Sequence, residues 1–352
     1  KNMIILFAGK YTGEYNRDKI LIEGLRNQND ITLIEYKFEK RRNFNRKKFQ
    51  NLSEQSDVIY CPSFSHKFVR LIKKHTTKPV VFDPLISYYL TKVFDYQNVK
   101  RRSPRALRNY LKDKLPFDAT DILLADTLEH KKYYHKTFNI PLEKIDILPV
   151  GANTSLFKPT TNEINHPLIV GFYGGFIPLQ GVKFIIEAAN LLKDNRSLIF
   201  NLIGSGYEYE KIQKLVSDYD LKNIHFDGWV DYDNLPLKIS KFDICLGIFG
   251  DTPKASLVIP NKIYHYAAMG KPIITMDSPA VREIFSPNKN IELVKNTGKA
   301  ISEKILALIN DPKKRKNLGI NARNLAEKEF NQDIIAQKLI DIINRKTKEG
   351  TH

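Results

Sequence analysis

The sequence predicts an α/β protein built from two Rossmann-like, doubly wound domains. Its 352 residues exceed what one hydrophobic core usually organises. Short apolar runs rich in Val and Ile alternate with longer segments of helical period, a pattern typical of parallel strands joined by helical crossovers. The alternation restarts after the polar, proline-containing stretch 158–167. We therefore expect one domain over 1–160, a second over 161–330, and a C-terminal helix and tail over 331–352 that cross back to the first domain.

Each half of the chain contains six apolar runs of strand length. In the first half they lie at 2–8, 31–36, 57–61, 79–82, 121–125 and 145–150. In the second half they lie at 168–174, 198–204, 223–226, 242–249, 271–276 and 291–294. Segments with helical spacing separate most of these runs, and the last such segment, 332–346, is amphipathic. Because open α/β sheets bind ligands outside the carboxyl ends of their strands, we expect the two domains to face a cleft with a two-substrate site.

The net charge of +17 is concentrated in the first 150 residues. That part contains 29 Lys and Arg against 17 Asp and Glu, a balance of +12. Two segments, 40–48 and 100–114, concentrate 13 of these 29 cations and interleave them with Leu and aromatic residues. A basic surface of this kind attracts anionic lipid, phosphorylated substrates or nucleic acid. Solvated helix faces that reflect coding bias are the alternative explanation. The sequence has no RNA-binding signature or aromatic platform, which counts against a nucleic-acid binder.

The two cysteines indicate a reducing compartment. Cys61 and Cys245 lie far apart, each within an apolar run, so they build neither a disulfide framework nor a zinc cluster. No apolar stretch approaches the roughly 20 residues of a membrane-spanning helix, and the opening run is too short for a signal peptide. We therefore expect a cytoplasmic protein that does not cross a membrane.

A glycine-rich turn opens the second half of the chain. Gly171, Gly174 and Gly175 lie at the end of an apolar run, and Gly181 lies at the start of a helix. Glycines at such a turn let the backbone approach a phosphate, and the helix N-terminus that follows favours an anion. The spacing differs from the dinucleotide fingerprint and lacks a Walker lysine, so a purely structural turn is the alternative. The pattern predicts that a diphosphate docks at this turn.

Several segments, spread over nearly the whole chain, resemble a known enzyme family. They are VVFDPLIS (80–87), DILLADTLEHKKYY (121–134), ILPVGANTSLFKP (147–159) and the stretch 254–285, which contains IPNKIYHYAAMGKP. In this order they are similar to bacterial GT-B glycosyltransferases of the family-4 type, which take part in polysaccharide and O-antigen synthesis. The resemblance implies transfer of a sugar from a UDP- or GDP-linked donor with retention of anomeric configuration. It implies neither a cofactor nor an obligatory metal.

The resemblance assigns the donor diphosphate to a basic helix start. Asn261 and Lys262 begin a helix, where unpaired N–H groups, the helix dipole and the lysine charge favour an anion. Lys254, in the preceding loop, is expected to offset the charge that develops on the leaving diphosphate. A solvated surface position is the alternative for each lysine. We predict catalytic roles for Lys254 and Lys262 and a donor contact for Asn261.

Two departures from the family pattern concern the same site. Leu257 and His265 stand where the family carries a Glu-x7-Glu pair, and Gly175 and Gln180 stand where it carries an Arg and a Lys. His265 can still hydrogen-bond a ribose hydroxyl, and Gln180 can still hydrogen-bond a phosphate oxygen. We expect a subfamily variant of the enzyme. A packed helix histidine is the alternative for His265, and a catalytically silent subunit is the alternative for the chain.

Residues at other strand ends complete the predicted site. The donor-binding residues are Gly174, Gly175, Gln180, Gly181, Gly204, Ser205, Val230, Asn261 and His265. In the first domain, Thr12 and Gly13 are expected on the acceptor side, and Asp83 is expected to face the sugar with a catalytic role. A helix N-cap is the alternative for Asp83. Asp231 and Asp233 have the spacing of a metal-binding pair but suit helix N-capping, so we expect no metal site.

The sequence thus predicts a retaining glycosyltransferase for cell-surface polysaccharide synthesis. We expect a hexose or N-acetylhexosamine to pass to a glycan acceptor carried by a polyprenyl diphosphate. No residue is a convincing enzyme nucleophile, so we expect same-face attack in which the leaving diphosphate accepts the proton and the lysines stabilise it. We expect the protein at the inner face of the plasma membrane, with segments 40–48 and 100–114 docked on anionic lipid.

Overall fold

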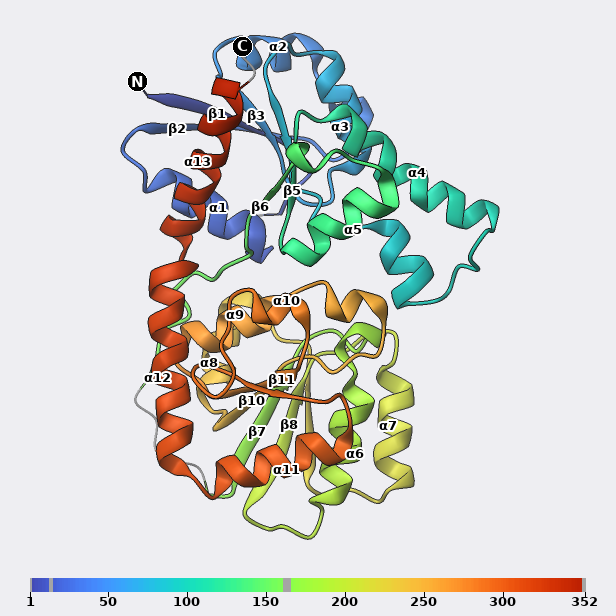
Figure 1. Ribbon diagram of the computed structural model, residues 1–352, viewed down its shortest axis with the longest axis vertical. Coiled ribbons are helices and arrows are strands. Elements are labelled where there is room, and N and C mark those ends of the chain that lie inside the picture. The colour runs from blue at the N-terminus through green and yellow to red at the C-terminus, as the bar shows by residue number, and fades with distance from the viewer. Residues whose placement is uncertain (1, 13–14, 161–165, 350–352) are drawn as a thin grey trace. The chain divides into compact units, whose positions relative to one another are not determined.

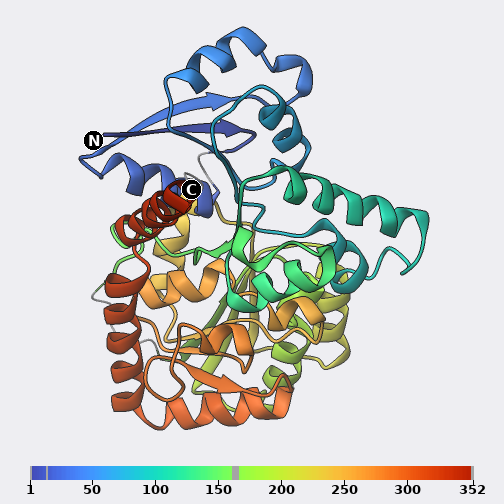
Figure 2. The ribbon, with the colours of Figure 1, turned by 45° about the horizontal axis from the view of Figure 1, so that its top comes forward.

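The computed structural model describes residues 2–12, 15–160 and 166–349, which divide into two compact units. Unit 1 contains the described residues up to Gly151 and those from Phe330 onward, and unit 2 runs from Ala152 to Glu329. Each unit is a six-stranded parallel sheet flanked by helices (Figures 1 and 2). The predicted α/β class with two doubly wound sheets is confirmed.

Unit 1 has the strand order β2-β1-β3-β4-β5-β6. Its strands are β1 (Met3–Gly9), β2 (Ile31–Lys37), β3 (Val58–Cys61), β4 (Val80–Phe82), β5 (Ile122–Ala125) and β6 (Ile145–Ile147). Its α-helices are α1 (Asn16–Arg26), α2 (Arg46–Glu54), α3 (His66–Lys74), α4 (Pro104–Ala119), α5 (Leu128–Phe138) and α13 (Gln332–Glu349). It also contains the 3-10 turns η1 (Arg41–Asn43) and η3 (Leu142–Lys144) and the π-helix η2 (Leu90–Asp95). Strands β3, β4 and β5 are buried along their whole length, which explains their uninterrupted apolar sequence.

Unit 2 has the strand order β12-β11-β10-β7-β8-β9. Its strands are β7 (Leu168–Tyr173), β8 (Leu198–Ile203), β9 (Ile224–Gly228), β10 (Ile244–Leu246), β11 (Ile273–Met276) and β12 (Glu292–Val294). Its helices are α6 (Val182–Leu191), α7 (Tyr209–Asp218), α8 (Leu235–Ser240), α9 (Asn261–Ala268), α10 (Pro279–Arg282), α11 (Gly298–Ile309) and α12 (Pro312–Glu329), with short turns η4 (Pro178–Gln180), η5 (Tyr232–Asn234) and η6 (Pro253–Ser256). The direction of winding reverses between β7 and β10, where such sheets bind ligands.

The C-terminal helix α13 belongs to unit 1, as the predicted crossover requires. It packs on α1, and a Cβ atom on Gly24 would lie 2.1 Å from the Gln332 carbonyl oxygen, so only glycine permits this approach. The Asn27 side-chain amide donates to Asp333 Oδ1 at 2.7 Å on the same contact. Helix α13 therefore completes unit 1 although it is the last element of the chain.

The segment that joins the two units begins earlier than the sequence suggested. The predicted boundary was residue 160, whereas the compact units meet after Gly151. Phe157 stacks on His265 with ring centroids 3.8 Å apart, and Arg323 donates to the Phe157 carbonyl at 3.0 Å. These contacts hold Phe157, which directly precedes the polar stretch 158–167, in unit 2. Within the described residues, no helix combines the length and apolar character needed to span a membrane.

Candidate functional site

Unit 2 brings the glycine turn after β7 against the loop after β8. The Gly174 N–H donates to the Ile203 carbonyl at 2.9 Å, and the Gly204 N–H donates to the Gly228 carbonyl at 2.6 Å. A Cβ atom on Gly204, whose φ is +130°, would lie 2.0 Å from the Gly174 carbonyl oxygen. Two glycines that the sequence assigned to the donor are therefore neighbours, and the close approach of their backbones requires glycine at 204.

Ser205 and Gly175, two further residues of the predicted site, are less closely packed than Gly174 and Gly204. The Phe176 N–H donates to the Ser205 carbonyl at 2.8 Å, while the Ser205 side chain is exposed. A Cβ atom on Gly175 would lie no closer than 3.8 Å to a side chain, the methyl group of Ile177, and 3.9 Å from the Ser205 carbonyl oxygen. Gly175 thus has room for a side chain, and nothing in the fold requires glycine there.

Lys262 is a buried cation near the start of α9. Its residue is 2% exposed, and its ammonium donates a hydrogen bond to Gln180 Oε1 and lies 3.5 Å from the centroid of the Phe172 ring. A Cβ atom on Gly174 would lie 2.8 Å from Lys262 Nζ, so the glycine leaves space for the ammonium. Burial lowers the pKa of Lys262 well below its usual value. The structure therefore joins Gly174, Gln180 and Lys262 in one cluster.

The charge of this cluster is not balanced. In the part of the chain that the structure describes, no carboxylate forms an ion pair with Lys262. A buried ion is costly unless it is paired, and the amide oxygen of Gln180 supplies only a partial negative charge. An anionic ligand would compensate the ammonium and raise its pKa. The cluster is chemically suited to bind a phosphate or diphosphate.

The cluster lies where the strand order of unit 2 reverses. The Phe249 N–H, in the loop after β10, donates to the Gln180 carbonyl at 3.0 Å. Gly181, at the N-cap of α6, has a φ of +63°, and a Cβ atom there would lie 2.3 Å from the Phe249 carbonyl carbon. The loops after β7 and β10 are therefore in direct contact at the position where open sheets bind ligands.

Three further residues of the predicted site occupy loops or helix starts in unit 2. Lys254 in η6 is 7% exposed, and the adjacent Ala255 packs in one apolar cluster with Leu179, which precedes Gln180. Asn261 is the first residue of α9 and is half-buried. Val230, which follows β9, is also half-buried. The structure places these residues on the elements that the sequence indicated.

Trp229, the one tryptophan of the chain, is not among the residues predicted for the site. It follows β9, beside Val230, and is 73% exposed. Tyr207, two residues after Ser205, is 70% exposed. Large exposed aromatic side chains after adjacent strands can stack on a flat base. Their position in strand-end loops is the sequence signal that could have indicated them.

Comparison with known families fits this geometry. Residues 155–325 match the family model described as glycosyl transferases group 1, which covers nearly all of unit 2. Unit 2 belongs to this glycosyltransferase family. The glycine turn, the buried Lys262 and Asn261 all lie within the matched residues.

Related proteins extend the comparison beyond the glycosyltransferase unit. The chain is 30% identical over 165 residues to an uncharacterized glycosyltransferase of Methanocaldococcus jannaschii, covering 45% of this chain and 42% of the relative. It is 25% identical to the capsular polysaccharide biosynthesis glycosyltransferase CapM of Staphylococcus aureus, covering 68% and 66% of the two chains. The chain spans about half the length of the first curated relatives that it matches.

Solved structures share the architecture of both units. The Anabaena HepE protein, crystallised with UDP and glucose, matches with a TM-score of 0.73 and 13% identity, covering 98% of this chain and all of the other. This likeness confirms the GT-B fold that the resemblance implied. The chain is thus a GT-B protein with relatives in polysaccharide biosynthesis.

His265 is packed inside the glycosyltransferase unit, which contradicts the predicted ribose contact. The residue is 1% exposed, stacks on Phe157 and lies with Nδ1 2.5 Å from the Tyr173 hydroxyl. Burial lowers the pKa of His265 to about 3, so the ring is neutral at physiological pH. Every residue of α9 after Asn261 is buried, so its position on the helix could not reveal which side chains face a ligand.

The surroundings of Asp83 also differ from the prediction that it faces the sugar. It is 2% exposed, and its Oδ2 accepts hydrogen bonds from Arg17 Nε at 2.5 Å and from the Tyr60 hydroxyl at 2.7 Å. Arg17, which is fully buried, also donates to the carbonyl of Leu148 at 3.0 Å. Asp83 therefore balances a buried guanidinium and occupies the N-cap position of no helix in the described residues. Arg17 lies on α1, so local sequence spacing gave no sign of the pair.

The remaining predictions concern the acceptor side and a metal. Thr12 is exposed after β1, and Gly13 lies outside the described residues. Asp231 occupies the N-cap position of η5, but its carboxylate accepts no capping hydrogen bond from the described backbone of the turn. Among the residues that the structure describes, no group of three His, Cys, Asp or Glu side chains could hold a metal ion.

Proposed function

We propose that this chain is a retaining glycosyltransferase that takes a hexose or N-acetylhexosamine from a nucleotide-diphosphate sugar. The observation that carries this proposal is the buried ammonium of Lys262, which lies beside the strand-end Gly174 and, among the described residues, donates a hydrogen bond only to the Gln180 amide oxygen. A nucleotide diphosphate supplies the missing negative charge. The presence of UDP in the HepE crystal structure supports the same ligand class for this chain.

The proposed chemistry needs stabilisation of a leaving diphosphate. Lys262 and Lys254, with the N-terminus of α9, would offset the negative charge that grows as the bond from the sugar to the diphosphate breaks. Asp83 is engaged by Arg17, which argues against its use as a nucleophile. The acceptor hydroxyl would attack from the same face, and a diphosphate oxygen would take its proton, giving retention. No divalent metal is required in this scheme.

The proposed acceptor is a glycan carried by a lipid in cell-surface polysaccharide synthesis. The relationship to the S. aureus CapM protein supports this class of pathway. The proposed location is the inner face of the plasma membrane, where the cations of segments 40–48 and 100–114 would bind anionic lipid. A location at the membrane would account for the positive charge of these two segments without nucleic acid as a partner.

A donor screen tests the proposal. UDP-, GDP- and dTDP-sugars are added in turn, and the unfolding temperature is measured, since a ligand of the folded state stabilises it by mass action. We expect one nucleotide class to stabilise the protein and its sugar to be transferred with EDTA present. NMR of the product should show the anomeric configuration of the donor. Inversion, or activity that EDTA abolishes and manganese restores, would refute the proposed mechanism.

A catalytically silent subunit is the second candidate. Leu257 replaces one carboxylate of the family pair, and His265, at the other position, is packed against Phe157. Such a subunit would bind a nucleotide yet neither transfer nor hydrolyse the donor sugar. Measured release of nucleotide from the stabilising donor, with Lys262→Gln as the negative control, separates the two candidates.

A further inference from the structure

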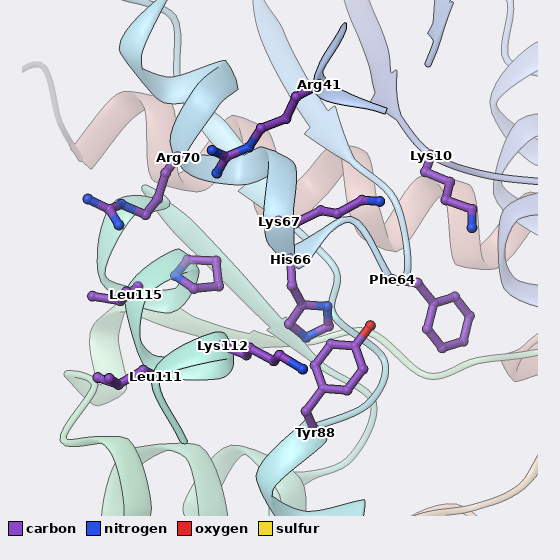
Figure 3. Close-up of a pocket in the computed structure, with 11 residues that line it drawn as sticks. Lys10, Arg41, Phe64, His66, Lys67, Arg70, Tyr88, Leu111, Lys112 and Leu115 are labelled. Atoms are coloured by element: carbon purple, nitrogen blue, oxygen red, sulfur yellow. The ribbon is translucent and has the colours of Figure 1, made fainter. Parts of the chain in front are cut away.

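Unit 1 contains a pocket of about 380 Å³ that the proposed donor chemistry does not use. Most of its lining residues come from α3 and α4 (Figure 3). Its cationic residues are Lys10, Arg41, Lys67, Arg70 and Lys112. Figure 3 shows them arranged around His66 and Tyr88, and none of the described residues that line the pocket is acidic. The pocket therefore concentrates positive charge at one point on the surface of unit 1.

The cations of this pocket are available to a ligand. None of the five forms an ion pair with an acidic residue in the described part of the chain. Two other hollows of unit 1 provide a contrast. In one, Arg26 is paired with Glu35, and in the other Lys73 is paired with Asp121 at 2.5 Å. The pocket around His66 differs from them because its five cations form no such ion pair among the described residues, which favours an anion of more than one negative charge.

The pocket lies at the carboxyl ends of two neighbouring strands of the unit 1 sheet. Lys10 directly follows β1, and Phe64 follows β3, the two strands between which the winding of unit 1 reverses. Ser65 joins the two loops, because its hydroxyl accepts from the Lys10 N–H at 3.2 Å. Ligands of doubly wound sheets bind at this position. The two basic segments of the sequence also meet here, since Arg41 comes from one and Lys112 from the other.

An exposed apolar stripe leads out of the pocket. Leu111 and Leu115 line it and are 39% and 40% exposed, and Leu107, one turn earlier on α4, is 59% exposed. The spacing of four residues places all three on one face of the helix. Arg108 and Lys112 follow the leucines in sequence and are exposed beside them. A cationic pocket continued by exposed leucines matches a ligand with a phosphate head and a hydrocarbon chain.

We propose that this pocket binds the phosphate group of a membrane lipid, with the hydrocarbon next to the leucine stripe of α4. The assignment of that lipid as the carrier of the acceptor glycan rests on the proposed function. The binding itself does not rest on it. A water-soluble phosphate polymer would satisfy the cations but would leave Leu107, Leu111 and Leu115 in water, so the structure favours the lipid.

The first test compares two variants of equal charge. The pocket variant combines Lys67→Gln, Arg70→Gln and Lys112→Gln. Sedimentation is measured with vesicles of phosphatidylcholine and phosphatidic acid, and with phosphatidylcholine alone. We expect the wild-type protein to bind only the phosphatidic acid vesicles, and the pocket variant to bind them at least about tenfold more weakly.

The matched variant removes three cations outside the pocket, by Arg42→Gln, Arg46→Gln and Lys47→Gln. These residues are exposed and belong to the same basic segment as Arg41. We expect this variant to lose clearly less affinity than the pocket variant. Equal losses would mean diffuse electrostatic attraction and would overturn the pocket proposal. Circular dichroism and thermal unfolding of both variants show whether they retain the wild-type fold.

The second test separates a lipid from a soluble phosphate. Leu107→Gln is compared with Leu191→Gln on α6, because both leucines are 59% exposed on helices. Weaker vesicle binding by the first variant alone supports the leucine stripe. Equal binding by both variants, together with displacement of the protein from vesicles by inorganic phosphate, would mean that the pocket takes a soluble anion.

A third comparison distinguishes a failure of the pocket proposal from a failure of the proposed donor site. We expect Lys262→Gln to lose nucleotide binding but keep vesicle binding, and the pocket variant to show the reverse. If no donor binds the wild-type protein, the proposed function fails while vesicle binding still tests the pocket. If vesicle binding is insensitive to the pocket variant while a donor still binds, the pocket proposal alone fails.

Discussion

The ammonium of Lys262 donates a hydrogen bond to the side-chain oxygen of Gln180, which lies 82 residues earlier in the chain. The contact joins the start of α9 to the turn after β7 and holds a buried cation beside a neutral acceptor. A bound diphosphate could take over this interaction with a full negative charge. The pair therefore explains how a site without the usual Arg and Lys of the glycine turn could still bind a nucleotide.

The two adjacent glycines of the turn provide a steric test. A Cβ atom on Gly174, at a φ of +146°, would lie 2.8 Å from Lys262 Nζ, whereas a Cβ atom on Gly175 would meet no atom closer than 3.8 Å. We expect Gly174→Ala to weaken nucleotide binding measurably and Gly175→Ala to leave it nearly unchanged. Titration calorimetry on both variants checks this. Equal effects would show that the ammonium position does not depend on Gly174.

The lowered pKa of Lys262 predicts a pH dependence of binding. Burial makes the free ammonium lose its proton below its usual pKa, and a bound diphosphate would raise that pKa again. Binding should therefore take up a proton when the pH lies between the two values, and affinity should fall as pH rises through that window. Calorimetry in two buffers of different ionisation enthalpy measures the proton count. Lys262→Arg, which stays charged, should abolish the uptake.

Asp83 should contribute to stability through its pair with Arg17. Removing one partner of a buried pair leaves the other charge uncompensated, so we expect Asp83→Ala to lower the free energy of unfolding by about 3 to 5 kcal/mol. The double variant Arg17→Met with Asp83→Leu should recover part of this loss. Urea unfolding followed by circular dichroism measures both. A fully stable Asp83→Ala protein would contradict the structural role.

The raised pKa of Asp18 predicts how the free energy of unfolding changes with pH. Burial raises its pKa from 3.8 to about 8, so between these values the folded state binds more protons than the unfolded state. Stability due to this group is therefore lost as pH rises from about 4 to about 8, with a slope of at most about 1.4 kcal/mol per pH unit. Asp18→Asn should gain stability relative to wild type over that range. The exposed Asp30→Asn variant is the control for urea unfolding across the range.

The order of strands and helices could be predicted because each element has its signal within its own short segment of sequence. Buried strands such as β3 and β5 are continuous apolar runs, and Asn261 and Lys262 do begin a helix. The partner of Asp83 could not be predicted, because Arg17 is 66 residues away and only the fold brings the two together. Burial of Lys262 was missed as well, since a lysine at a helix start is usually solvated.

The least reliable predictions were those of which side chains on a helix are buried and which are exposed. Leucines four residues apart normally mark a core-facing stripe, yet Leu107, Leu111 and Leu115 of α4 are exposed. Helix α9 is buried almost throughout, so His265 shows no contrast between a packed and a ligand-facing side. In both helices the exposure of a side chain depends on what packs around the helix, and the local sequence does not show this.

The most direct test of the donor site is calorimetric titration of UDP and GDP against wild type, Lys262→Gln and Lys211→Gln. Lys211 is an exposed lysine on α7 in the same unit and serves as the matched control. We expect one nucleotide to bind wild type and Lys211→Gln equally. Binding to Lys262→Gln should be weaker by about 1 to 3 kcal/mol, the value of one charge-assisted contact. Equal affinity of all three proteins would contradict a diphosphate site at Lys262.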